Sequence, residues 1–258
     1  MYFVGAGPGD PELVTRKGWR LIAAADLVLY AGSLVPAELV AQARPGARVV
    51  DSSPLTLEQT HALLVETVRA GGLAVRLHTG DPALYGAVRE QMELLEREGI
   101  DCEVVPGVTA AFAAAAAARR SLTVPGATQT LVVARLEGRT PVPERESLRE
   151  LARHGSAMAV YLSAGDPGLV QEELLAGGYP PDTLTVVAHR VGWPDGRAVE
   201  TRLGELAKTA REMGLSRQAV FLILPGQEAS GARSRLYDAG FGHGFRPARA
   251  QEEGDGGA

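Results

Sequence analysis

Residues 73–86 read LAVRLHTGDPALYG, and this stretch decides the fold. The run ending at Leu77 is short and mostly apolar, which is typical of a buried strand. Gly80 can adopt a backbone conformation that is closed to other residues, and Asp81-Pro82 is typical of a helix start. From residue 83 to about residue 98, apolar residues recur every three or four positions, which predicts a helix. The stretch therefore predicts a strand, a tight loop and a helix in succession.

Asp81 falls where the predicted strand ends and the predicted helix begins. In open α/β sheets, small ligands bind just beyond the carboxyl ends of the strands. A carboxylate and bare backbone amides at this edge suit a polar, partly cationic ligand. Simple capping of the helix is the alternative, and for this fragment alone it is the commoner case.

Composition narrows the class of protein. The chain has 258 residues, of which 45% are apolar, and a net charge of −5 at pH 7. This acidic balance argues against a nucleic-acid partner, because a basic patch dominates such surfaces. Cys102 is the single cysteine, and no Cys/His cluster has zinc spacing, so we expect no metal site. No targeting segment or membrane-length apolar run is visible, which predicts a cytoplasmic protein without a membrane partner.

Alternation of strands and helices indicates how the chain is divided. It runs through residues 1–120 and predicts βαβ units with a mostly parallel sheet in an N-terminal α/β domain. Residues 121–128 carry Pro and Gly without helical periodicity and are predicted to be a linker. Residues 129–246 are predicted to form a second α/β domain, in which the turn signal at 193–196 predicts a hairpin and hence a mixed sheet. Residues 247–258 are predicted to be a disordered tail.

The glycine-rich turn GAGPGD, residues 5–10, invites a dinucleotide-binding interpretation. Its spacing is G-x-G-x-G, Pro8 removes a backbone donor, and Asp10 places a negative charge where a pyrophosphate would lie. A tight turn without a ligand remains open. His78 and His189 each end a predicted strand, where they either line a cleft or serve the core, and the core role is the commoner one.

Several loops taken together resemble those of the S-adenosylmethionine-dependent tetrapyrrole methylases of corrin and sirohaem synthesis. The matching pieces are Val4–Pro11, Gly80–Gly86 and Pro106–Ala111. Three more pieces resemble the branch of this family that methylates C-11 of precorrin-4 or of its cobalt form. They are Tyr30–Val35, Gly138–Glu144, and Ser234–Asp238 together with Phe241–Arg246.

This resemblance implies two α/β domains, in a homodimer, with S-adenosylmethionine and a tetrapyrrole in the cleft between the domains. The implied donor contacts are Pro8, Gly80, Asp81, Tyr85, Thr109, Ala110, Leu162, Ala188 and Ala219. Asp81 is also the one candidate for a catalytic role. The candidates for holding the tetrapyrrole are Gly7, Gly9, Ser33, Arg135 and Arg190. The two arginines are chosen because the acceptor carries many carboxylates, which arginine binds bidentately.

Two alternatives stay open at this point. The first is a methyltransferase of the same fold with another acceptor, such as a different precorrin carbon, ribosomal RNA or a modified histidine. The second is a non-catalytic carrier that holds a tetrapyrrole intermediate for the next enzyme. An intact Gly80-Asp81-Pro82 loop favours an enzyme, because a carrier has no need of a donor site.

Overall fold

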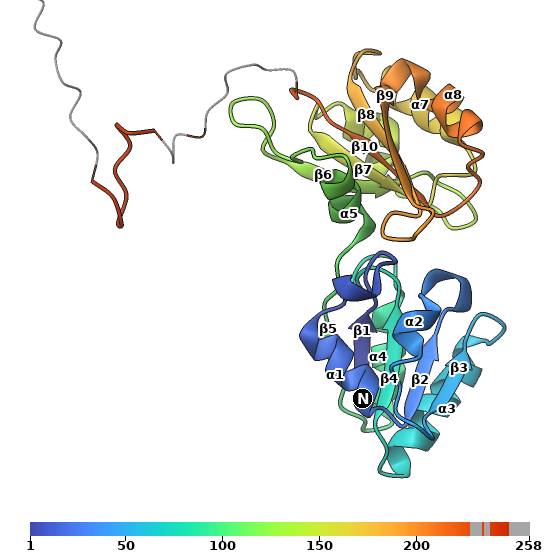
Figure 1. Ribbon diagram of the computed structural model, residues 1–258. Helices are drawn as coiled ribbons and strands as arrows, with labels where there is room; N and C mark the ends of the chain where they lie inside the picture. Colours follow the sequence, from blue (N-terminus) through green and yellow to red (C-terminus); the bar gives the residue numbers. More distant parts are fainter. Residues whose placement is uncertain (228–233, 235–237, 248–258) are drawn as a thin grey trace, which may run out of the picture.

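The computed structural model describes residues 1–227, 234 and 238–247, which form two lobes and a short C-terminal turn (Figure 1). Each lobe is built on one β-sheet covered by helices on both faces. The predicted tail, apart from residue 247, and most of the Ser234–Asp238 motif lie outside the described residues. No helix in the described ranges is long and apolar enough to cross a membrane.

The first lobe contains a five-stranded sheet in the order β3-β2-β4-β1-β5, and all of its strand pairs are parallel. The strands are β1 (Tyr2–Gly5), β2 (Leu27–Tyr30), β3 (Arg48–Asp51), β4 (Ala74–His78) and β5 (Glu103–Val105). The α-helices are α1 (Arg16–Ala24), α2 (Ala37–Val40), α3 (Leu57–Arg69) and α4 (Val88–Arg97). Successive strand residues face opposite sides, so Val4 packs in the cluster with α1 and α2, whereas Phe3 packs in the cluster with α3 and α4. The predicted parallel sheet is confirmed.

Strands β1 and β4 lie side by side at the centre of this sheet, with Gly5 paired to His78. The chain leaves β1 toward α1 on one face and leaves β4 toward α4 on the other, so a crevice opens between the two connections. The two loops also hydrogen-bond to each other, because Gly80 N donates to Gly7 O at 2.7 Å and Gly7 N donates to Gly80 O at 3.2 Å. This edge is where α/β sheets bind ligands.

The second lobe contains a mixed sheet in the order β6-β7-β10-β8-β9. Its strands are β6 (Leu131–Arg135), β7 (Ala157–Tyr161), β8 (Leu184–His189), β9 (Arg197–Arg202) and β10 (Ala219–Ile223). Only β6 and β7 pair in parallel, and β8 and β9 form the predicted hairpin. One face is covered by α6 (Leu148–Ala152), α7 (Pro167–Ala176) and α8 (Leu206–Glu212). The mixed sheet predicted for this half of the chain is confirmed.

Helix α5 (Ala110–Ala117) covers the other face of the second sheet (Figure 1). Its buried residues Ala111, Ala114 and Ala115 meet Ala157 and Ala159 of β7 and neighbouring apolar residues of β8 and β10. Alanine on both sides lets the helix lie close to the sheet. By its packing α5 therefore belongs with the second sheet, although it precedes the predicted boundary at residue 120, which stays a prediction.

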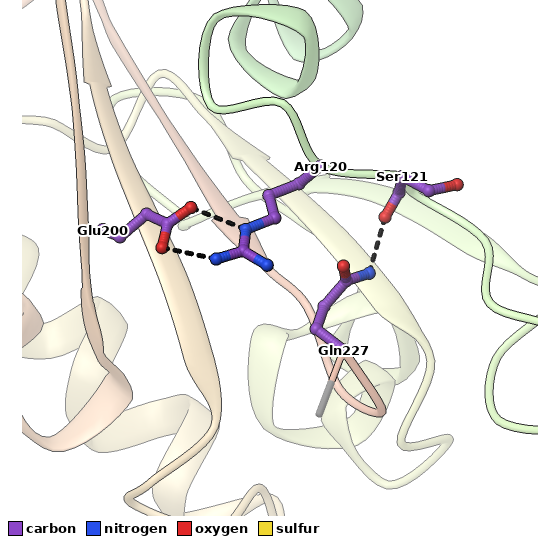
Figure 2. A network of polar contacts seen from close by, with 4 residues as sticks. All are labelled: Arg120, Ser121, Glu200 and Gln227. Carbon is purple, nitrogen blue, oxygen red and sulfur yellow. Dashed lines mark hydrogen bonds and ion pairs between the residues drawn. The ribbon is translucent and has the colours of Figure 1, made fainter. Parts of the chain in front are cut away.

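The chain that follows α5 is tied to the second lobe by polar contacts (Figure 2). The Arg120 guanidinium donates to both carboxylate oxygens of Glu200 on β9, at 2.6 and 2.7 Å. Gln227 Nε2 donates to the carbonyl oxygen of Ser121 at 2.7 Å. The Arg120 guanidinium lowers the pKa of the Glu200 carboxyl, as expected for a bidentate pair. The start of the predicted linker is therefore fixed against the second sheet.

One predicted helix start is wrong. Helix α4 begins at Val88, not at residue 83, because Tyr85 and Ala87 have φ of 54° and 48°, which interrupts a right-handed helix. The segment after the glycine-rich turn contains a short 3₁₀ turn followed by α1. Thr15 separates the two pieces, since its extended backbone and its side-chain oxygen cap α1 by accepting from Gly18 N at 3.0 Å.

Candidate functional site

A cleft of about 480 Å³ lies between the two lobes. Its walls are the loops that follow β1, β4 and β5 in the first lobe, facing the loops that follow β7 and β8 and precede β10 in the second. The volume is within the range of small-molecule sites. All nine residues predicted to contact the methyl donor line it: Pro8, Gly80, Asp81, Tyr85, Thr109, Ala110, Leu162, Ala188 and Ala219. The fold thus brings together residues that are far apart in sequence, and their role toward a donor stays a proposal.

Three glycines meet where the first lobe borders the cleft. A Cβ on Gly5 would lie 2.6 Å from the Gly107 Cα, and a Cβ on Gly107 would lie 2.1 Å from the Gly80 carbonyl oxygen. These neighbours are backbone atoms, so they have no side-chain freedom with which to move away. The loops that follow β1, β4 and β5 therefore approach as closely as they do because Gly5 and Gly107 lack side chains, whereas Gly80 contributes its carbonyl oxygen and has a φ of +63°, which favours glycine.

Asp81 joins two of these loops through its carboxylate. Oδ1 accepts a hydrogen bond from Ala83 N at 2.8 Å, and Oδ2 accepts one from Gly107 N at 2.9 Å. The first closes a tight turn within the loop that follows β4, and the second reaches the loop that follows β5. Helix capping by Asp81, the simpler alternative, is wrong because α4 starts seven residues later, at Val88. The carboxylate instead fixes the loops that carry Gly80 and Thr109.

Tyr161 lines the cleft and was missed by sequence reasoning. Its hydroxyl lies 2.7 Å from Thr109 Oγ1 and accepts a hydrogen bond from Ala111 N at 2.7 Å. Its ring is tilted against that of Tyr85, with 5.9 Å between the centroids. Burial raises the pKa of Tyr161, so the phenol stays protonated near neutral pH. Its position directly before Leu162, at the end of a buried strand, was the signal that could have identified it.

Replacing Tyr161 by Phe is expected to weaken binding of S-adenosylhomocysteine roughly tenfold, because the Ala111 amide and the Thr109 hydroxyl lose their partner. Isothermal titration calorimetry measures the change. Tyr179→Phe is the matched control, since the Tyr179 hydroxyl donates to Ser156 O in the core of the second lobe. That control is expected to lower the melting temperature and leave affinity unchanged. Equal affinities for Tyr161→Phe and the wild type would contradict this role.

Unusual backbone conformations concentrate at the cleft. Six non-glycine residues of the described chain have positive φ, and four of them, Tyr85, Leu162, Arg190 and Gln218, line the cleft. Such conformations persist only where the surrounding structure enforces them, and they cluster at ligand sites. The Leu162 side chain is 70% exposed, which is unusual for leucine and leaves an apolar surface facing the cleft.

The residues predicted to hold a tetrapyrrole do not all line the cleft. Arg190 lines the cleft, whereas Gly7, Gly9 and Arg135 are not part of its lining. Gly7 and Gly9 lie in the loop that follows β1, beside the cleft residue Pro8. Ser33 lies in the 3₁₀ turn Gly32–Leu34, next to the cleft residue Leu34. Arg135 donates to three carbonyl oxygens in the loop that follows β6, at 2.8 to 3.1 Å.

No histidine is among the described residues that line the cleft. Among the described residues, no group of three or more His, Cys, Asp or Glu side chains lies together as metal ligands would. His78 is buried beside Phe3 and is not part of the cleft lining, so the structure places it in the core. Burial, reinforced by the nearby Arg76 charge and opposed by that of Asp81, lowers the pKa of His78 to about 4.

This burial of His78 predicts a pH dependence of stability. The unfolded chain, with a histidine pKa of 6.5, takes up the proton before the folded protein does as the pH falls. Stability is therefore complete above about pH 6.5 and is lost toward pH 4. The free energy of unfolding is expected to fall about 3 kcal/mol more in the wild type than in His78→Asn between pH 7 and pH 4. Urea titrations across this range measure it, and parallel pH profiles for the two proteins would contradict it.

The similarity of this chain to known proteins points to one family. The family of tetrapyrrole (corrin/porphyrin) methylases matches residues 1–207. A cobalt-precorrin-4 C(11)-methyltransferase of Priestia megaterium is 47% identical over 95% of this chain and 97% of the relative. A precorrin-4 C(11)-methyltransferase of Pseudomonas aeruginosa is 44% identical over 96% of this chain and 98% of the relative.

Solved structures agree with this relationship. The crystal structure of a cobalt precorrin-4 methyltransferase, described as a cobalamin biosynthetic enzyme, aligns with a TM-score of 0.84 at 48% identity, covering 86% of this chain and 93% of that one. The uroporphyrin-III C-methyltransferase of Thermus thermophilus in complex with S-adenosylhomocysteine aligns with a TM-score of 0.71 at 34% identity, covering 86% and 91%. The chain, with its parallel and mixed sheets and its cleft at the Gly-Asp-Pro loop, belongs to the tetrapyrrole methylases.

Proposed function

We propose that this protein transfers the methyl group of S-adenosylmethionine to C-11 of precorrin-4, in its cobalt-containing or metal-free form. One observation carries the proposal: a chain 47% identical to a cobalt-precorrin-4 C(11)-methyltransferase brings all nine predicted donor contacts into one cleft. The proposal includes both forms of the acceptor because relatives named for each have similar identity to this chain, at 47% and 44%.

The cleft suits S-adenosylmethionine in size and chemistry. Leu162, Ala188 and Ala219 supply apolar surface for the adenosyl part, and Asp81 supplies a negative charge that attracts a cationic ligand. When bound, this co-substrate supplies a methyl group on a positively charged sulfur. The fit rests on side chains and backbone already in place, since the loops that carry Gly80 and Thr109 are fixed by the Asp81 carboxylate.

The residues of this chain contribute orientation more than covalent chemistry. Methyl transfer to carbon is an in-line displacement, for which the protein must hold two reactants in line and exclude water. Asp81 fixes the loop that follows β5, and Tyr161 fixes the start of α5 beside the cleft. Asp81, the candidate catalytic residue, thus has a positioning role in this proposal. Arg135 and Arg190 remain the residues proposed to bind acceptor carboxylates, together with Gly7, Gly9 and Ser33.

Assembly and location are further parts of the proposal. We propose a homodimer, which is supported by the exposure of Phe112 on α5 (57%) and of Val133 on β6 (38%). Light scattering coupled to gel filtration tests it, and a monomeric mass at micromolar concentration would refute it. A cytoplasmic location stays a prediction, which cell fractionation tests.

The decisive experiment identifies the product. The protein is incubated with ¹³C-methyl-labelled S-adenosylmethionine and with precorrin-4, in parallel with and without cobalt in the ring. We expect mass spectrometry to find one added methyl group and NMR to place it on C-11. A label on another carbon would indicate a different acceptor position. Bound pigment without any methyl gain would indicate a carrier and refute the proposal.

A further inference from the structure

The loop that joins β8 to β9 reaches from the second lobe to the first. A Cβ placed on Gly9 would lie 2.2 Å from Trp193 Cδ1 and 2.3 Å from its Nε1, so the indole ring rests directly on the bare backbone of Gly9. The neighbouring Gly192 approaches from the same side, since a Cβ there would lie 2.9 Å from Asp10 N. The two lobes therefore touch where neither backbone carries a side chain.

The Trp193 ring is held in this place from within the second lobe. The Arg190 guanidinium lies over it, with 4.4 Å from Cζ to the ring centroid. Arg190 is itself fixed, because its Nε pairs with the Asp195 carboxylate at 2.8 Å and its Nη1 donates to Gln218 Oε1 at 2.7 Å. The indole thus contacts both a restrained guanidinium and Gly9.

This contact borders the cleft. Pro8, Arg190 and Trp193 all contribute to the cleft lining, and both Arg190 and Gln218 have positive φ, at 48° and 55°. Strained backbone on the side that holds the ring indicates that its position is enforced by the surrounding structure. A rigid ring braced against the other lobe fixes how far apart the two walls of the cleft stand.

We propose that Trp193 is a positioning residue for methyl transfer, which sets the separation of the two lobes by resting on Gly9. This inference rests on the proposed function. A donor held by both lobes and an acceptor beside it must be aligned within a narrow distance, and a displacement of about 1 Å can cost roughly a hundredfold in rate. A wider cleft still binds ligands but aligns them poorly.

The test separates rate from affinity. Single-turnover methyl transfer to precorrin-4 is measured at saturating S-adenosylmethionine, and S-adenosylhomocysteine affinity is measured by calorimetry. Trp193→Ala is expected to slow transfer roughly ten- to a hundredfold at saturation. Trp193→Phe keeps a flat ring against Gly9 and is expected to recover most of the rate. Trp19→Ala is the matched control, because Trp19 lies on α1 and is 38% exposed, and we expect both its rate and its affinity to equal those of the wild type.

A double-mutant cycle tests the contact itself. Gly9→Ala adds a methyl group against the indole and also strains the backbone, since φ of Gly9 is +148°. The strain remains when Trp193 is removed but the clash does not, so Gly9→Ala should slow transfer less in the Trp193→Ala background than in the wild type. Circular dichroism and melting temperature establish that each variant is folded.

The outcomes are distinct. A saturated rate equal to the wild type in Trp193→Ala, with only its affinity reduced, would overturn the positioning role and make Trp193 a simple binding contact. Additive effects in the cycle would overturn the part played by Gly9. Failure of the wild-type protein to bind S-adenosylhomocysteine would refute the proposed function and this inference together, whereas wild-type activity with an unaffected Trp193→Ala refutes the inference alone.

Discussion

Gly107→Ala is expected to lower the free energy of unfolding by about 3 kcal/mol and to abolish measurable donor binding. The added Cβ would lie 2.1 Å from the Gly80 carbonyl oxygen and 2.8 Å from the Gly5 Cα. Both neighbours are backbone atoms of central loops, so relief requires the loops that follow β1 and β4 to move apart. Urea denaturation and calorimetry with S-adenosylhomocysteine measure the two effects.

The control for this variant is Gly138→Ala, since no heavy atom lies within 4 Å of a Cβ built there and the position does not have positive φ. It should match the wild type in both stability and affinity. If Gly107→Ala bound the ligand as tightly as Gly138→Ala, the close approach of the three glycines would not be what shapes the cleft.

Asp81→Ala is expected to reduce affinity for S-adenosylhomocysteine about a hundredfold. Both carboxylate oxygens accept backbone amides, from Ala83 at 2.8 Å and from Gly107 at 2.9 Å, and hydrogen bonds to charged groups each contribute about 1.5–3 kcal/mol. Without them the loop that carries Gly80 loses its fixed position relative to the loop that carries Thr109. The effect on S-adenosylmethionine should be at least as large, because that ligand is also cationic.

Asp26→Ala provides a matched control for the loss of a carboxylate that accepts a backbone amide. Asp26 Oδ2 accepts from Leu73 N at 2.6 Å just before β4, whereas Asp81 lies just after the same strand. Asp26→Ala should therefore reduce stability and leave the affinity unchanged. Comparable losses of affinity in both variants would mean that Asp81 acts through general stability and not through the cleft.

Sequence patterns were sufficient for the order of strands and helices, because buried strands are apolar runs and loops carry Gly, Pro and Asp. The parallel first sheet and the mixed second sheet both followed from this alternation. Motif resemblance added the cleft residues, which no periodicity could have grouped. Thr109 and Leu162, for example, lie in different lobes and meet only through folding.

Other features depended on contacts that a sequence does not reveal. The start of α4 was misplaced because Asp81-Pro82 is a common helix start, and here the Asp81 carboxylate is used by Gly107 instead. Tyr161 is another such feature, because its hydroxyl hydrogen-bonds to Thr109 and Ala111, which are distant in the sequence. Likewise, the sequence around Gly9 does not indicate that Trp193 contacts this residue in the fold.

The alanine contacts between α5 and the second sheet have a consequence for dissecting the protein into fragments. A cut at residue 120 would leave an eight-residue, wholly apolar helix attached to the first lobe with its partner surface removed. A cut before residue 108 would instead keep that helix with the strands it covers and leave the first five-stranded sheet complete. Separate halves should therefore be divided before α5, so that this helix stays with the second sheet, and not at the proline-containing segment that comes after it.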